Sequence, residues 1–113
     1  MRAHLVQLNI AWEDRPTNFR RVRSLLETAP VEPGDLVALP ELFDTGFSMN
    51  TAKTADLDGA TLAFLREIAT TMGVTIQGGR TVKHPGGKGA DANASNEMTA
   101  IGRDGQILCR DAA

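Results

Sequence analysis

Apolar and polar side chains alternate in residues 3–9, and the chain then changes to a helical pattern. Alternation with a period of two is typical of a β-strand with at least one buried face. In residues 16–29 the apolar side chains recur at helical spacing, after candidate capping residues and a proline suited to a first helical turn. The pattern predicts a strand and then a helix, whose apolar stripe consists of Phe19, Val22, Leu25, Leu26 and Ala29.

The same order of strand and helix is repeated in the next segment. Residues 35–39 form an apolar run that is too short for a helix and suits a buried strand. A second apolar stripe follows Asp58-Gly59 and ends at Gly73, the usual glycine at a helix C-terminus. Residues 74–79 then predict a third strand. Strands joined by helices indicate βαβ units with a parallel sheet.

The last part of the chain predicts an antiparallel hairpin. A glycine-rich connection over residues 81–93 leads to a fourth strand at 96–101, and a turn at 102–105 leads to a fifth strand at 106–109.

A length of 113 residues, with 42% hydrophobic and 23% charged residues, fits one folded domain. We therefore expect an α/β domain that includes residues 1–113.

Composition narrows the classes of partner. The formal net charge is −2 and the basic residues are scattered, so we expect no nucleic-acid partner. The sequence has no signal-peptide pattern at its start and no apolar segment of about 18 residues, which predicts a cytoplasmic protein without a membrane span. The single cysteine, Cys109, excludes an internal disulfide. Because it falls in a predicted strand, we expect a buried structural thiol.

The sequence contains no pattern for a metal ion or a nucleotide. His4 and His84 stand alone, and no His, Cys or acidic pair has metal-ligand spacing, so we expect neither a metal nor a cofactor. The glycine-rich residues 86–89 lack the first glycine and the Ser or Thr of a phosphate-binding loop, and we interpret them as a plain loop. A small nucleotide-binding domain is disfavoured because no glycine fingerprint follows the first strand.

One glutamate stands where α/β proteins place functional groups. Glu41 directly follows the second predicted strand and begins a long loop over residues 41–58. Its neighbours Leu39, Leu42 and Phe43 are apolar, and partial desolvation would make the carboxylate a stronger base. The local features leave two interpretations open, a general base or an exposed loop glutamate.

A longer motif favours the first interpretation. The string LPELFDTGFSMN, residues 39–50, resembles the first catalytic block of the nitrilase superfamily of carbon–nitrogen hydrolases. Its segment TGFSM resembles the omega-amidase branch. The resemblance extends along the whole chain, with further matches at Gln7-Leu8-Asn9, Asn18, Gly78-Gly79 and Asn96. It implies the N-terminal portion of the nitrilase-type four-layer αββα sandwich.

The resemblance also implies a mechanism. In this family a glutamate, a lysine and a cysteine act together, and Glu41 would take the proton from the cysteine thiol. A thioester acyl-enzyme would form and be hydrolysed by water, with a small-molecule amide as the substrate. Phe43 and Phe47 are candidates for lining the substrate pocket, although aromatic residues in such a loop equally serve as packing anchors.

The chain departs from the family pattern near its end. Ala112 follows Asp111 where the family has its lysine, and the family's cysteine lies beyond residue 113. The alternative hypothesis is therefore a truncated, non-catalytic remnant or an interaction module. Half of a sandwich would leave one sheet face and its strand edges uncovered, which favours pairing with another chain and leaves homo-oligomer formation open.

Overall fold

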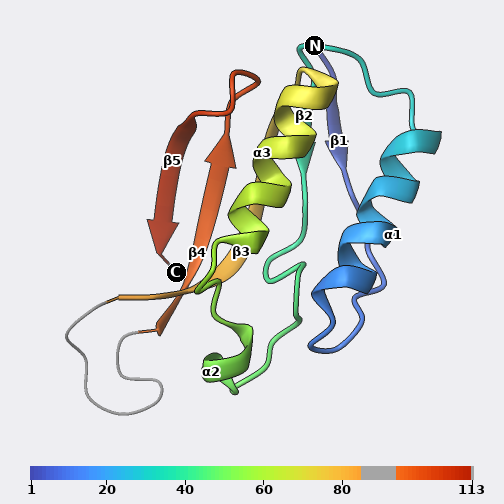
Figure 1. Cartoon of the computed structure of the whole chain (residues 1–113). Helices are drawn as coiled ribbons and strands as arrows, with labels where there is room; N and C mark the ends of the chain where they lie inside the picture. Colours follow the sequence, from blue (N-terminus) through green and yellow to red (C-terminus); the bar gives the residue numbers. More distant parts are fainter. Residues whose placement is uncertain (85–93, 113) are drawn as a thin grey trace.

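A five-stranded mixed sheet with helices on one face makes up the computed structural model, which describes residues 1–84 and 94–112. In chain order, the elements are β1 (Ala3–Leu5), α1 (Arg15–Thr28), β2 (Leu36–Ala38), α2 (Thr51–Thr54), α3 (Ala60–Met72), β3 (Thr75–Lys83), β4 (Ala94–Ile101) and β5 (Ile107–Ala112). The strands lie side by side in the same order as in the sequence (Figure 1).

The first three strands form the parallel part of the sheet. β1 pairs with β2 and β2 pairs with β3, so that His4, Val37 and Ile76 lie in register. The connections between them contain α1 and then α2 and α3. The predicted βαβ units with a parallel core are confirmed.

The ends of the two long helices follow from local chemistry. Asp14 precedes α1, and its side chain accepts a hydrogen bond from the backbone N–H of Thr17, which otherwise has no partner within the helix. Gly73 ends α3 in the left-handed conformation, with a φ of 69°, and its N–H donates to the carbonyl of Ala69. A side chain disfavours this backbone conformation, so the predicted stop at Gly73 is confirmed with its physical reason.

The last three strands are antiparallel. β4 pairs with β3 on one side and with β5 on the other, which confirms the predicted hairpin. Two strand ends differ most from the prediction. β1 ends at Leu5, because its partner β2 ends at Ala38, opposite Leu5. β3 continues to Lys83, because β4 pairs with it along its whole length. The glycine-rich residues 86–89 lie outside the described residues.

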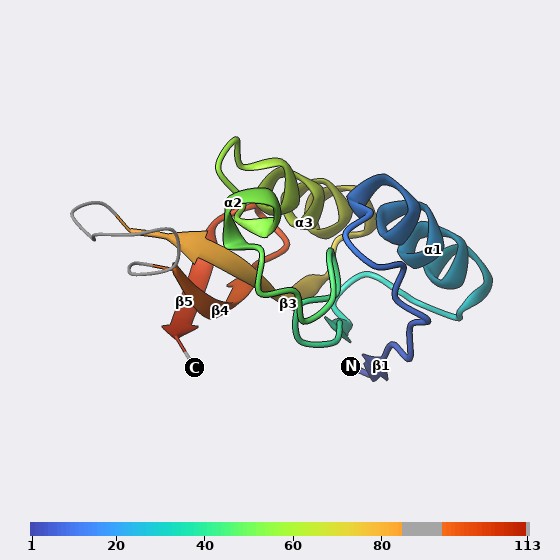
Figure 2. The ribbon, with the colours of Figure 1, turned by 90° about the horizontal axis from the view of Figure 1, so that it is seen from below.

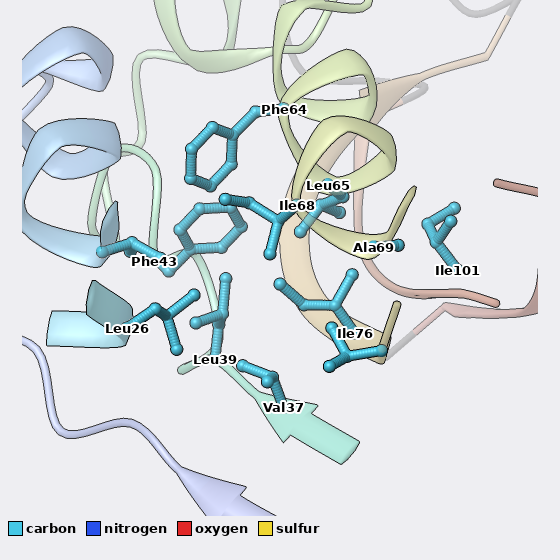
Figure 3. Close-up of a cluster of buried hydrophobic side chains, with 12 residues drawn as sticks. Leu26, Val37, Leu39, Phe43, Phe64, Leu65, Ile68, Ala69, Ile76 and Ile101 are labelled. Carbon is cyan, nitrogen blue, oxygen red and sulfur yellow. The ribbon is translucent and has the colours of Figure 1, made fainter. Parts of the chain in front are cut away.

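The core lies between the sheet and the helices. Buried side chains from α1 and α3 meet buried side chains of the strands on one face of the sheet (Figure 3). Phe19 stacks on Phe64 with ring centroids 4.2 Å apart, and Phe43 lies 6.0 Å from Phe64. These rings attach the loop after β2 to both helices, and offset aromatic pairs of this kind stabilise beyond the area that they bury.

The other face of the sheet is not covered by helices. Successive residues of a strand point to opposite faces, and the buried Val37, Ile76 and Ile101 point toward the helices. Their neighbours Gln77 and Ala100 therefore point away, to the face that Figure 2 shows below the sheet. We call this surface the open face. One sheet with one helix layer is the N-terminal portion of the four-layer αββα fold, as predicted.

A buried carboxylate ties the start of β1 to the start of β2. Asp35 Oδ2 lies 2.8 Å from His4 Nε2, and the Asp35 carboxylate also accepts from the backbone N–H groups of Arg2 and Glu32. The hydrogen bond from His4, followed by those from the two N–H groups, holds the pKa of Asp35 far below its usual range.

Replacing this carboxylate is expected to change how stability depends on pH. A lowered folded-state pKa stabilises the fold above the unfolded-state value of about 4, and this contribution is lost as the pH falls below it. Asp35→Asn is therefore expected to lower the thermal midpoint at pH 7, with the difference from wild type closing toward pH 2. Thermal unfolding followed by circular dichroism measures this. A difference that stays constant from pH 7 to pH 2 would count against the charged role of Asp35.

Candidate active site

The loop after β2 begins with a tight turn that carries Glu41. The backbone N–H of Leu39 donates to the carbonyl of Gln77 and prolongs the pairing with β3 up to Pro40. Leu42 then adopts a φ of 50°, and its carbonyl accepts from the N–H groups of Thr45 and Gly46. A positive φ is unfavourable for a leucine, and such strain gathers at functional sites. The turn is thus a candidate site on backbone geometry alone.

Two residues from distant strands contact Glu41. The side-chain amide Nδ2 of Asn96, on β4, donates a hydrogen bond to Glu41 Oε1. Gly79, on β3, lies directly against the turn, since a Cβ atom added there would be 3.0 Å from the Cα of Glu41. Both contacts lie on the open face, because Asn96 and Gly79 alternate with residues that point toward the helices. Glu41 is therefore held at the edge of that face.

We expected the carboxylate of Glu41 to be partly desolvated. This expectation is wrong, because among the described residues the Glu41 side chain is exposed. The apolar neighbours Leu39, Leu42 and Phe43 are buried within the fold, so they do not surround the carboxylate. Sequence neighbours of a turn residue point in different directions, and burial of one side chain says little about the next. The carboxylate of Glu41 faces solvent on the open face.

The two phenylalanines of the loop lie in different environments and are not brought together. Phe43 is fully buried and packs against Phe64 (Figure 3) and against Phe19, whose ring stacks on that of Phe64. Gly78 makes room for it, because a Cβ there would come within 2.7 Å of the Phe43 ring. Phe47 is 63% exposed. Of the two roles left open by the sequence, Phe43 has the packing role, and Phe47 is free to contact another molecule.

A buried ion pair fixes the loop that follows Glu41. Asp44 is fully buried, and its Oδ2 accepts from Arg15 Nε at 3.1 Å and from the Thr61 hydroxyl at 2.8 Å. Arg15 also donates to the hydroxyl of Thr61 and to the carbonyl of Thr54. Burial raises the pKa of Asp44, while the bond from Thr61 and the charge of Arg15 act in the opposite direction. One charged group thereby joins the loop to α1, α2 and α3.

An asparagine strengthens the same attachment. Asn18 is fully buried in α1, and its Nδ2 donates to the carbonyl of Asp44 at 2.7 Å and to that of Ala11 at 2.8 Å. Its Oδ1 accepts from the N–H of Ala11 at 2.7 Å. The side-chain amide therefore satisfies backbone groups of two loops that would otherwise be buried without partners. In the sequence, only the resemblance to the family singled out Asn18.

The family model of the carbon–nitrogen hydrolases matches residues 2–112. The chain belongs to the carbon–nitrogen hydrolase family. Two relatives are each 32% identical to it. The match to an omega-amidase, YafV, from Yersinia enterocolitica covers 92% of this chain and 38% of the relative. The match to a nitrilase from Pyrococcus abyssi covers 69% of this chain and 32% of the relative. The chain thus spans about a third of the length of these relatives.

Solved structures of carbon–nitrogen hydrolases have the same fold. A superfamily protein from Xanthomonas campestris has a TM-score of 0.78 and 32% identity, and the match covers 94% of this chain and 38% of that one. A hydrolase from Helicobacter pylori has a TM-score of 0.75 at 19% identity, and the match covers 97% of this chain and 38% of that one. The second likeness shows the fold alone.

Other candidate groups of this carbon–nitrogen hydrolase chain lie apart from Glu41. Cys109 is exposed on β5, so the expected buried thiol is wrong. Cys109 lies opposite Ala100, whose side chain points to the open face, so the helices do not cover the thiol. His4 is paired with Asp35, and His84 lies on the other side of the sheet from Asn96, bonded to Ser95.

Among residues 1–84 and 94–112, no group of three or more His, Cys, Asp or Glu side chains is arranged to hold a metal ion. In the same ranges no helix has both the length and the apolar character needed to cross a membrane. The contact between Asn96 and Glu41 is the feature of the site that sequence reasoning missed.

Proposed function

We propose that residues 1–113 form part of the catalytic domain of a carbon–nitrogen hydrolase acting on small amides, with Glu41 as the general base. The observation that carries the proposal is the placement of Glu41. A strained turn after a parallel strand presents its carboxylate on the open face, and Asn96 binds one carboxylate oxygen. The family membership of the chain agrees with this role.

The chemistry proposed for Glu41 is proton transfer from a cysteine thiol. The thiolate would attack the amide carbonyl, the nitrogen would leave as ammonia with the proton, and a thioester would remain on the enzyme. Water would then cleave the thioester, releasing the acid and restoring the thiol. A lysine would stabilise the oxyanion of each tetrahedral intermediate. Residues outside these 113 would supply the lysine and the nucleophilic cysteine, since Ala112 occupies the expected lysine position and Cys109 lies on β5.

For the substrate we propose the terminal amide of a small dicarboxylic acid, such as a keto acid. The support is the 32% identity with an omega-amidase and the TGFSM segment of residues 45–49. Phe47 is exposed on this segment and would form one wall of the substrate pocket. Phe43 would hold the loop in place from the core. No cofactor enters the proposed reaction.

An interaction module is the second candidate function, because Ala112 stands at the expected lysine position. Exposed apolar side chains on the two edge strands also favour it. Leu5 is 83% exposed on the edge strand β1, and Leu108 is 62% exposed on the edge strand β5. Uncovered strand edges and apolar side chains pair readily with another chain, including a second copy of the same chain.

An assay of ammonia release separates the two candidates. The longest native polypeptide that contains residues 1–113 would be incubated with the terminal amide of a dicarboxylic keto acid, with a dipeptide as the control substrate. The proposal expects ammonia from the amide and none from the dipeptide, and no turnover by the 113-residue chain alone. Absence of turnover on a panel of small amides and nitriles by the longer polypeptide would overturn it and favour the interaction module.

A further inference from the structure

We propose that Asn96 and Gly79 are positioning residues that fix the carboxylate of Glu41 for proton transfer. The inference rests on the proposed function of Glu41 as the general base. It concerns the two strands β3 and β4, which the local sequence around Glu41 does not include. Asn96 sets the orientation of the carboxylate, and Gly79 sets the position of the backbone that carries it.

The hydrogen bond from Asn96 gives the two carboxylate oxygens of Glu41 different roles. Oε1 accepts from the side-chain amide of Asn96. Among the described residues Oε2 accepts no hydrogen bond, and it remains available for the proton of a nucleophile. An amide donor suits this role, because it has no charge and does not take up a proton at neutral pH. A general base must lie within hydrogen-bond reach of its proton, so fixing the rotation of the carboxylate contributes directly to the rate.

The backbone of Asn96 is itself held firmly. It lies opposite Thr81 in the antiparallel pairing of β3 and β4, and Thr81 is buried. The carbonyl of Thr81 also accepts from the N–H of Asp56, whose side chain is fully buried and paired with Arg80 at 2.8 Å. The donor is therefore attached to a rigid part of the sheet. Positions on rigid strands give the accuracy that a positioned donor needs.

Gly79 controls the position of the turn. A Cβ atom at this position would lie 2.9 Å from the backbone nitrogen of Leu42 and 3.0 Å from the Cα of Glu41. Both neighbours are backbone atoms of the turn that has the positive φ at Leu42, so they could yield only if the turn moved. The absence of a side chain lets the turn rest directly on β3. A larger residue would displace Glu41 away from the strand.

The test compares variants at Asn96 with a neighbouring control in the longest native polypeptide. Asn96→Ala is expected to lower kcat about tenfold with KM unchanged, since a carboxylate that is free to rotate is less often within reach of the thiol proton. Asn96→Asp has nearly the same shape but cannot donate and repels Glu41, so its kcat is expected to be lower still. Ser95→Ala removes a hydrogen bond to His84 on the opposite side of the strand and is expected to keep wild-type kcat.

Gly79→Ala provides the second measurement, with Gly102→Ala as the control glycine in the hairpin beyond β4. We expect kcat to fall in Gly79→Ala and not in Gly102→Ala, in variants that unfold cooperatively. An NMR spectrum of the side-chain amides should also show the Asn96 signals shifting in Glu41→Gln and not in Glu27→Gln.

The outcomes separate this inference from the proposed function. If Glu41→Gln is inactive while Asn96→Asp keeps wild-type kcat, the positioning role is overturned and the general base remains. If Glu41→Gln keeps wild-type kcat, the general base is overturned, and the positioning role with it. A loss of kcat in Asn96→Asp and Gly79→Ala but in neither control supports the inference.

Discussion

Glu41→Gln is expected to lower kcat/KM about a thousandfold in the native polypeptide that contains this chain, the middle of the range for general-base catalysis. Glutamine has nearly the same shape and can still meet Asn96, but it cannot accept the proton of a thiol. The hydrogen bond between Asn96 and Glu41 places the carboxylate at the end of the turn, away from the core, so the fold should not change. Steady-state kinetics of ammonia release measures the effect.

Two variants serve as controls for this prediction. Glu27→Gln removes an exposed carboxylate from α1, on the helix layer, and should keep wild-type kcat/KM. Glu41→Asp keeps a base but withdraws it by one methylene group from the position that Asn96 defines, so an intermediate loss is expected. Activity of Glu41→Gln within threefold of wild type would remove Glu41 from the chemistry.

Arg15→Met is expected to have the largest effect on stability, a loss of about 3 kcal/mol or more in the free energy of unfolding. The substitution leaves Asp44 fully buried without its cation and removes the donor to the carbonyl of Thr54. Such a loss is a large part of the roughly 5–15 kcal/mol that stabilises a domain. Chemical denaturation followed by circular dichroism measures it.

The pH dependence of this loss tests its cause. Burial raises the pKa of Asp44 and Arg15 opposes the rise, so removing Arg15 raises the pKa further. The folded variant then holds a proton that the unfolded chain releases near pH 4, and its stability falls as the pH rises above that value. The loss should therefore be larger at pH 8 than at pH 4, and Asp44→Asn in the same chain should recover part of it.

Lys53→Met is the matched control for Arg15→Met. Lys53 pairs with Glu13 at 3.3 Å in the same region, but its side chain is 59% exposed, so the loss should stay below about 1 kcal/mol. Equal losses for the two variants would show that the buried pair does not anchor the loop. A loss for Arg15→Met that is independent of pH would contradict the role of the charge on Asp44.

Most of the fold could be predicted from local patterns. The two long helices have apolar stripes and clear end signals, such as the glycine at position 73, and the short apolar run before Pro40 could only be a strand. The bounds that failed depend on partners. β1 is short because its partner β2 ends at Ala38, and β3 is long because β4 pairs with it up to Lys83. Residue type alone does not determine the partner of a strand.

The site could be predicted only in part. Glu41 was found because it follows a strand and lies within a family motif, both of which are local signals. Its contact with Asn96 joins positions 55 apart in the sequence and depends on the register of β3 and β4. The environments of Phe43 and Cys109 were not determined by the sequence for the same reason. Phe43 is buried by α1 and α3, and Cys109 is exposed because it lies opposite Ala100 on the open face.

The central claim is that Glu41 takes the proton of the nucleophile, and the rate of acyl-enzyme formation tests it most directly. Rapid mixing of the native polypeptide with a dicarboxylic keto-acid amide, followed by acid quenching and intact-mass spectrometry, detects the covalent thioester. We expect the thioester to accumulate in the wild type within one turnover and to remain undetected in Glu41→Gln over the same time. Formation of the thioester at the wild-type rate in Glu41→Gln would contradict it.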